Sequence, residues 1–258
     1  MKMHIDQKYK VLKADLVETI LNFNSFENGF GTGKRNSVKK IDLPNLTVVV
    51  KSFKIPFLMN QIAYKYIRKS KAKRSYEYTK KLTSLNILSP TPIAYIEYFS
   101  WFGLKHSFYI SEFLDYDFTI KDLLKQPNHP EFETILAAFT RFTFKLHEKG
   151  IHFLDHSGGN TLIVKNNDGY NFYLVDLNRM KFEPLSFDQR MENFSRISPK
   201  KEMVEIMSRE YASLINQPFE KVFERMWHYT HVFFNKSHHK KVVKDILHAK
   251  HFRDLCHN

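Results

Sequence analysis

The pattern of apolar and polar residues divides the chain into a strand-rich first part and a helix-rich second part. The segment "TVVVKSF", residues 47–53, is β-branched and apolar up to Lys51, which is typical of a strand. Upstream, residues 24–46 predict a strand, a glycine-rich turn, a second strand and a turn at "DLPN". Residues 1–25 mix short helical and strand patterns and predict no long element.

Helical periodicity begins near residue 56. Residues 56–85 are strongly charged, with an apolar residue at every third or fourth position, and "SPTP" at 89–92 ends the pattern. Short strands follow at 93–100 and 106–114, and then a short helix at 117–126. An amphipathic helix is predicted over 130–150, between Pro130 and Gly150, and residues from about 187 onward again favour helices. The sequence thus predicts an α+β fold.

A loop and a hairpin interrupt the helical part. The stretch "IHFLDHSGGNTLIV", residues 151–164, leads into an apolar run that is joined to "NFYLVD", residues 171–176, through an Asp-Gly turn. Such a turn between apolar runs strongly indicates a β-hairpin. Because a hairpin returns the chain to where it started, we expect Asn160 and Asp176 to lie side by side, with Asp155 one short loop upstream.

Two carboxylates and an amide at one sheet edge suit phosphoryl transfer. Carboxylate and amide oxygens are ligands for Mg²⁺, which completes its shell with water and phosphate oxygens. A further carboxylate can accept the proton of an attacking hydroxyl. A structural alternative remains open, since Asp155 and Asn160 could simply cap turns.

The first part of the chain offers groups that could hold phosphates. Gly29, Gly31 and Gly33 in "NGFGTGK" would let backbone N–H groups approach phosphate oxygens, although an ordinary hairpin turn would also use them. Lys51 ends a strand, and Glu77 on the basic helical stretch is the best candidate for its carboxylate partner. Glu77 could instead pair with Lys73 or Lys81 on its own helix.

This order of motifs resembles the protein-kinase-like fold. The segments "KAKRSYEYTKKL", "SPTPIAYIE", "LDHSGGNTLI" and "FYLVDLNRMKF" resemble the bacterial lipopolysaccharide core kinase family, which includes Kdo and heptose kinases. The resemblance covers roughly residues 25–200. It implies two lobes, a β-rich N-lobe over 1–111 and a mostly helical C-lobe over 112–258.

The resemblance also implies a role for each motif residue. Asp155 would be the catalytic base, Asn160 and Asp176 the Mg²⁺ ligands, and Lys51 the contact to the α and β phosphates of ATP, with Glu77 as its ion-pair partner. The backbone of the hinge, Glu112 to Leu114, would meet adenine. The implied acceptor is a Kdo or heptose hydroxyl on a lipid A-linked core sugar.

Several positions depart from the protein-kinase pattern. Phe153 and Leu154 stand where His and Arg would precede the catalytic Asp, which argues against control by a phosphorylated activation loop. Asn178 replaces the glycine of Asp-Phe-Gly, and Lys34 takes the place of the third glycine of the loop. A pseudokinase-like nucleotide-binding module therefore stays open, as does a phosphotransferase acting on a protein or another small molecule.

Composition narrows the partners and the compartment. Lys and Arg number 40 against 27 Asp and Glu, a formal charge of +13, which attracts polyanions such as anionic lipid. No nucleic-acid motif accompanies the charge, so nucleic acid is not expected, and the basic residues 65–74 are either a solvated helix face or a contact to an anionic membrane surface. With a single cysteine, Cys256, and no apolar run of spanning length, we expect a cytoplasmic, peripheral protein on the inner membrane.

Overall fold

The computed structural model describes residues 1–27, 36–53, 64 and 68–236. Backbone contacts group the chain into two compact units. The first comprises Met1–Asp117 and Leu162–Met180, and the second comprises Phe118–Thr161 and Lys181–Asn258. The lobe boundary expected between residues 111 and 112 stays a prediction.

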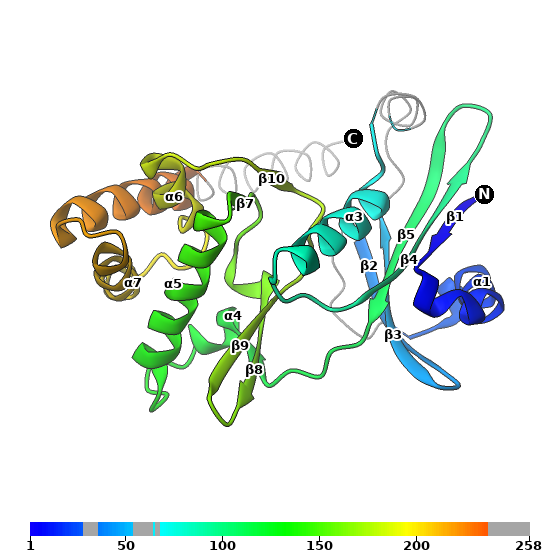
Figure 1. Ribbon diagram of the computed structural model, residues 1–258, viewed down its shortest axis with the longest axis horizontal. Helices are drawn as coiled ribbons and strands as arrows, with labels where there is room; N and C mark the ends of the chain where they lie inside the picture. The colour runs from blue at the N-terminus through cyan, green and yellow to red at the C-terminus, as the bar shows by residue number, and fades with distance from the viewer. Residues whose placement is uncertain (28–35, 54–63, 65–67, 237–258) are drawn as a thin grey trace, which may run out of the picture. The chain divides into compact units, whose positions relative to one another are not determined.

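A five-stranded antiparallel sheet, in the order β1-β4-β5-β3-β2, forms the centre of the first unit (Figure 1). The strands predicted at 47–53, 93–100 and 106–114 are confirmed, and Lys51 pairs in register with Tyr109 of β5 and Val38 of β2. The bounds of the strands are Lys2–Ile5 (β1), Asn36–Leu43 (β2), Leu46–Phe53 (β3), Pro92–Phe99 (β4) and Leu104–Glu112 (β5).

The helix predicted over 56–85 is present as α3, Lys71–Ser84. Residues 68–70 are not helical, so the prediction of one continuous helix is wrong at these residues. The reason is the hydroxyl of Ser70, which accepts the backbone N–H of Lys73 at 3.0 Å and so begins a new helix. Residues 54–63 and 65–67 of the predicted segment lie outside the described residues.

The strand predicted before the glycines is wrong over residues 24–27, because the 3-10 helix η2, Phe23–Ser25, reaches into this range and no strand follows it up to residue 27. The buried ammonium of Lys39 on β2 explains this, because it donates to the carbonyls of Phe23 at 2.9 Å and Phe26 at 2.5 Å. A cation at these carbonyls satisfies acceptors that a turn leaves unpaired. Gly29, Gly31 and Gly33 themselves lie outside the described residues.

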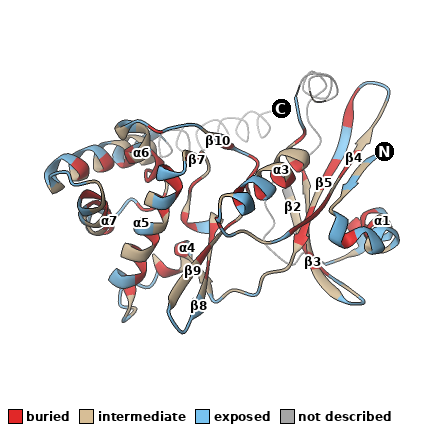
Figure 2. Ribbon diagram, viewed as in Figure 1, coloured by how far each residue is buried: buried red, intermediate tan, exposed pale blue. Residues whose placement is uncertain are grey.

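One face of the sheet is closed by the N-terminal helices η1 (Gln7–Leu12) and α1 (Lys13–Leu21). Leu16 and Ile20 of α1 are buried in the same cluster as Val48, Val50 and Ile110. Figure 2 shows the buried residues of β3, β5 and helix α3 in red. Apolar burial of this kind is the main stabilising term for the unit, and it fixes β3, which carries Lys51.

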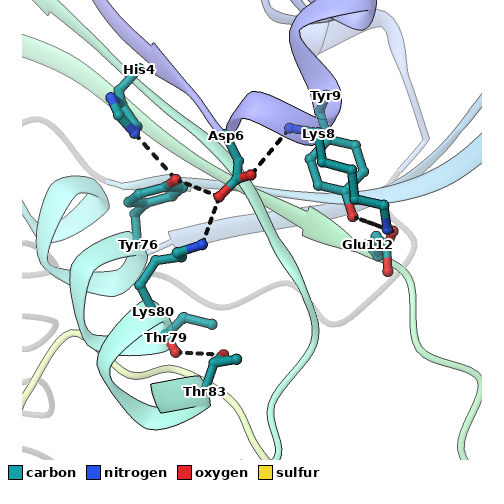
Figure 3. Close-up of polar contacts among 9 residues, drawn as sticks. All are labelled: His4, Asp6, Lys8, Tyr9, Tyr76, Thr79, Lys80, Thr83 and Glu112. Carbon is teal, nitrogen blue, oxygen red and sulfur yellow. Dashed lines mark hydrogen bonds and ion pairs between the residues drawn. The ribbon is translucent and has the colours of Figure 1, made fainter.

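The N-terminal strand is tied to helix α3 by polar contacts (Figure 3). The carboxylate of Asp6 accepts from Lys80 Nζ at 2.8 Å and from the hydroxyl of Tyr76 at 3.1 Å, and His4 meets the same hydroxyl at 3.2 Å. The bond from Lys80 outweighs the cost of burial and lowers the pKa of Asp6. Asp6 also caps η1 by accepting from Lys8 N at 3.3 Å, so one carboxylate joins the segment to α3.

We expect Asp6→Ala to lower the free energy of unfolding by about 1–2 kcal/mol, because the change removes a helix cap and leaves Tyr76 and Lys80 without this acceptor. Chemical denaturation would measure the loss. Glu18→Ala on the exposed face of α1 is the control and should change stability by less than about 0.5 kcal/mol. Equal stability of the two variants would show that the contacts of Asp6 with α3 do not stabilise the fold.

The hairpin predicted after Asn160 is confirmed and belongs mainly to the first unit. It consists of β8, Thr161–Asn166, and β9, Gly169–Leu174, joined at Asn167 and Asp168. Gly169 has φ of 132°, a backbone conformation that favours glycine. The amide of Leu174 donates to the carbonyl of Leu88 at 3.0 Å, which docks the end of the hairpin beside the segment that follows α3.

The second unit is mostly helical. The helix predicted over 130–150 is confirmed as α5, Phe132–Glu148, whose buried side chains include Ile135, Leu136, Phe139 and Leu146. Its other elements are β6 (Phe118–Thr119), α4 (Ile120–Leu123), β7 (Ile151–Phe153), η3 (Gly158–Asn160), β10 (Met180–Phe182), α6 (Phe187–Asn193), α7 (Lys201–Leu214) and a helix over 219–236. Within the described part of the chain, no helix combines the length and apolar character needed to cross a bilayer.

Candidate active site

Lys51 and Asp176 form an ion pair in the first unit. Lys51 Nζ lies 2.5 Å from Asp176 Oδ1, and the two side chains are only 14% and 31% exposed. The strand β3 therefore presents its lysine to the carboxylate that follows the β8–β9 hairpin. At this distance and burial the pair is screened less than a surface ion pair would be.

The backbone at Asp176 is unusual for a residue with a side chain, since its φ is 59°. Non-glycine residues adopt this left-handed conformation rarely and at a cost, and they do so often at functional sites. The side-chain amide of Asn178 donates to Asp176 Oδ1 at 2.6 Å, the oxygen that also meets Lys51. Asn178 thus stabilises the turn in which a kinase would have glycine.

Glu77 has a different partner from the one expected. Its Oε2 accepts from Lys69 Nζ at 2.7 Å, and among the described residues no ion pair joins it to Lys51. Lys69 precedes α3, so the contact links the start of the helix to its second turn. The pairing of Glu77 with Lys51 in a nucleotide-bound state stays a prediction.

The predicted hinge follows β5. The amide of Glu112 donates to Thr91 O and that of Phe113 to Thr47 O, each at 2.9 Å, whereas the amide of Leu114 has no backbone acceptor among the described residues. The Glu112 carboxylate accepts from the hydroxyl of Tyr9 and lies 3.5 Å from Lys8 Nζ (Figure 3).

The N-terminal segment thus holds the end of β5. Burial tends to raise the pKa of Glu112, but the Tyr9 hydrogen bond and the Lys8 charge outweigh it and lower the pKa. Burial also raises the pKa of Tyr9, which keeps its hydroxyl a donor.

Asp155 and Asn160 lie in one loop of the second unit. The amide nitrogen of Asn160 donates to the backbone carbonyl of Asp155 at 2.8 Å, which closes the five-residue loop. The Asp155 carboxylate is paired with Arg196 at 2.8 Å, with side-chain exposures of 19% and 35%. The guanidinium of Arg196 also lies 5.2 Å from the ring of Phe233, on the helix over 219–236.

Buried neutral histidines anchor the backbone on either side of Asp155. His147 on α5 meets the hydroxyl of Tyr211 at 2.8 Å and Asn193 Oδ1 at 3.1 Å, and Asn193 Nδ2 donates to the carbonyl of Phe153 at 2.8 Å. His156, the residue after Asp155, meets the hydroxyl of Thr143 at 3.1 Å. Through these contacts α5 and α6 fix the strand and turn that carry Asp155.

Two site residues other than the expected ones stand out, Arg196 and Asn193. They come 41 and 38 residues after Asp155 and belong to no spacing motif, so no local pattern predicts either residue. His147 and His156 could be noted only as histidines near the loop. Burial of an imidazole is a tertiary property, and no local pattern predicts it.

Gly158 lies close to the backbone of α4. A Cβ at Gly158 would lie 3.0 Å from the backbone nitrogen of Lys121 and 3.2 Å from its Cα, whereas a Cβ at Gly159 would lie 3.8 Å from the end of the Lys121 side chain. The contacts at position 158 are tight and involve backbone atoms, so a side chain there would force the loop or α4 to shift. The contact at position 159 is an ordinary van der Waals contact, so a side chain there would fit without a shift.

A solved structure matches the chain over nearly its whole length. "WaaP in complex with acyl carrier protein" covers 92% of this chain and 98% of its own, with a TM-score of 0.60 and 14% sequence identity. The chain has a protein-kinase-like fold. The two-lobed α+β fold expected from the sequence is thereby confirmed.

Two kinases align less closely. The Rio2 kinase from Chaetomium thermophilum, as an ADP/Mg²⁺-phosphoaspartate complex, has a TM-score of 0.46 and 14% identity over 85% of this chain and 67% of its own. The MAP kinase LmaMPK10 from Leishmania major has a TM-score of 0.46 and 12% identity over 84% and 66% of the two chains. No family model matches the chain, and neither does the sequence of any curated protein.

We expect Gly158→Ala to lower the free energy of unfolding by about 1–3 kcal/mol, because the loop or α4 must shift to admit the methyl group. Gly159→Ala is the matched control, one residue away in the same loop, and should stay within about 0.5 kcal/mol of the wild type. Thermal or chemical unfolding of both variants would measure the difference. A Gly158→Ala protein as stable as Gly159→Ala would show that the approach to Lys121 is not tight.

Stability should fall as the pH drops from about 6.5 towards 3. Burial lowers the pKa of His147 and of His156 to about 3 each, and the neighbouring His152 adds to the effect on both. Below pH 6.5 the unfolded chain takes up protons that the folded chain does not, so each residue removes up to about 1.4 kcal/mol of stability per pH unit.

Denaturation between pH 7 and 5 would measure this slope. His156→Gln should flatten the slope by about one proton. A slope that His156→Gln does not alter would contradict a buried neutral His156.

Proposed function

We propose that this protein transfers the γ-phosphoryl group of ATP to a hydroxyl of a lipopolysaccharide inner-core sugar, Kdo or heptose, and uses Mg²⁺. The observation that carries the proposal is the ion pair of Lys51 with Asp176, 2.5 Å apart. A strand lysine and a carboxylate after a hairpin are the phosphate and metal groups of kinase-like enzymes. The kinase-like fold supports the same reaction class.

The residues fit a Mg²⁺ ion. The amide nitrogen of Asn160 is used by the Asp155 carbonyl, so its oxygen is the atom left for a ligand. Lys51 and Asn178 both contact Oδ1 of Asp176, so Oδ2 is the oxygen that we propose as the ligand of the cation. Hard oxygen ligands of this type suit Mg²⁺, and the ion when bound would neutralise charge on the phosphates.

Asp155 takes the proton in the proposed reaction. As the acceptor hydroxyl oxygen bonds to the γ-phosphorus, its proton passes to the Asp155 carboxylate, the bond from that phosphorus to the bridging oxygen of ADP breaks, and ADP leaves. Arg196, 2.8 Å from Asp155, holds the carboxylate in a fixed direction. His156 and Asn193 hold the adjoining backbone, so Asp155 meets the hydroxyl with little motional freedom.

The remaining roles are assigned by the resemblance. Lys51 would exchange Asp176 for the α and β phosphates, with Glu77 as its partner. Gly29, Gly31 and Gly33 would cover the phosphates. The backbone of Glu112 and Leu114 would meet adenine, and the Leu114 amide, without a backbone acceptor among the described residues, supports this assignment.

The acceptor and the place of action rest on the same resemblance. A core sugar linked to lipid A lies at a membrane, and a chain with a formal charge of +13 is attracted to an anionic surface. We therefore place the reaction at the cytoplasmic face of the inner membrane, with the protein bound peripherally.

The test is phosphate transfer from ATP with Mg²⁺ to Kdo-lipid A and to a heptose-bearing core. Asp155→Asn should lower kcat by roughly 10²–10⁴-fold, because it removes the general base, and should leave the Kd for Mg-ATP within about two-fold. Asp168→Asn, in the exposed turn of the β8–β9 hairpin, is the matched control and should keep wild-type activity.

The preferred acceptor would decide between Kdo and heptose. Transfer that survives Asp155→Asn would overturn the assigned base. Binding of Mg-ATP without transfer to either acceptor would favour a pseudokinase-like module or a phosphotransferase for a protein or another small molecule.

A further inference from the structure

Two aromatic side chains occupy the tip of the β4–β5 hairpin, which Figure 1 shows at the upper right. The amide of Ser100 donates to Gly103 O at 2.8 Å and closes the turn, which leaves Trp101 and Phe102 at its two central positions. Their exposures are 88% and 64%. Such positions ordinarily hold Gly, Asn, Asp or Ser, which suit tight turns.

Both rings remain largely exposed to water in the folded chain. A single exposed apolar residue is common on protein surfaces, whereas two adjacent aromatic rings at a tip form an apolar patch that water solvates poorly. The stem beneath them is firmly packed, because Phe108 belongs to the buried core and Tyr98 packs against it. The rings are therefore carried on a well-anchored hairpin.

Two exposed lysines lie near the tip. The ammonium of Lys2 on β1 lies 5.2 Å from the ring of Phe99, at the end of β4, and Lys105 follows Phe102 by three residues. The acid of this region, Glu97, is 6% exposed. The described surface at this end of the sheet is thus aromatic and positively charged.

We propose that the tip formed by Trp101 and Phe102 inserts into the interface of an anionic bilayer, with Lys2 and Lys105 against the lipid head groups. Tryptophan prefers the head-group level of a membrane, and basic residues near the surface add attraction to anionic lipid. The aromatic tip suits the apolar side of the membrane interface, and the neighbouring lysines suit its anionic head groups. The inference rests on the proposed function, which places the acceptor in a membrane, and names a contact that serves it.

The experiment uses the full chain with Trp227→Phe. The protein has two tryptophans, so this variant leaves Trp101 as the only one. Vesicles of phosphatidylglycerol and phosphatidylethanolamine should shift Trp101 emission to the blue, and brominated lipid should quench it. Vesicles of phosphatidylcholine alone should do neither. Unchanged emission with anionic vesicles would overturn the proposal, including the case where the protein sediments with them through another surface.

A matched pair of double variants isolates the tip. Trp101→Ser with Phe102→Ser should weaken partition into anionic vesicles by roughly ten-fold or more. Val11→Ser with Leu21→Ser removes two other exposed apolar side chains, 86% and 72% exposed, and should change partition by less than about two-fold. Equal losses in the two pairs would overturn the specific role of the tip.

The basic residues are tested in the same assay. Lys2→Gln and Lys105→Gln should each weaken binding to anionic vesicles by roughly five-fold, and less in high salt. No loss from either would overturn their part in the surface.

Transfer to a delipidated core sugar separates this inference from the proposed function. The tip variants should keep full activity on that acceptor, since they lie outside the assigned catalytic residues. Transfer without any vesicle binding would overturn the tip proposal and leave the function intact. Vesicle binding through Trp101 without transfer to any core sugar would support the tip and contradict the function.

Discussion

The ion pair of Lys51 with Asp176 is the contact on which the first unit's candidate chemistry depends. It joins β3, an interior strand of the sheet, to Asp176 after the β8–β9 hairpin, although 125 positions separate Lys51 and Asp176 in sequence. Each side chain is largely shielded from water, so each charge would be costly to leave alone. The pair therefore holds the end of the hairpin at β3. In the proposed reaction it must open, and the phosphates would replace the carboxylate that Lys51 loses.

In the second unit, neutral hydrogen bonds hold the backbone around the carboxylate of Asp155. Asp155 sits in a loop whose backbone is fixed by uncharged groups, the imidazoles of His147 and His156 and the amides of Asn160 and Asn193. Neutral hydrogen bonds suit this place, because buried charges would need partners of their own. The use of buried imidazoles also makes the loop sensitive to acid, because either imidazole must become exposed to water before it takes up a proton.

The sequence predicted those features that local pattern controls. The hairpin after Asn160 followed from an Asp-Gly turn between two apolar runs, and α5 followed from its amphipathic period between Pro130 and Gly150. The lysine at the end of β3 was visible because the strand before it is β-branched. Each of these signals lies within about 20 residues, where turn chemistry and periodicity act directly.

What the sequence missed depends on contacts between distant segments. The first 27 residues were poorly predicted, because their structure depends on contacts that local periodicity does not show. Lys39 donates hydrogen bonds to the carbonyls of η2, and β1 pairs with β4. The contact of Glu77 with Lys69 was also not predicted, and the pairing of Glu77 with Lys51 stays a prediction. Arg196 was not found at all, because a guanidinium that meets a loop 41 residues upstream follows no motif.

Each unit pairs its candidate carboxylate with a cation, Lys51 with Asp176 in the first unit and Arg196 with Asp155 in the second. Removal of either cation would leave a partly buried carboxylate without its counter-charge, which is destabilising. The two cations differ in what they can do next. Lysine is a compact point charge that readily changes partners, as a residue that moves from a carboxylate to phosphates must. Arginine holds its partner in a planar fork, which suits a residue that keeps a base directed at a hydroxyl. The assignment of Lys to the metal carboxylate and Arg to the base thus follows the demands of the proposed reaction.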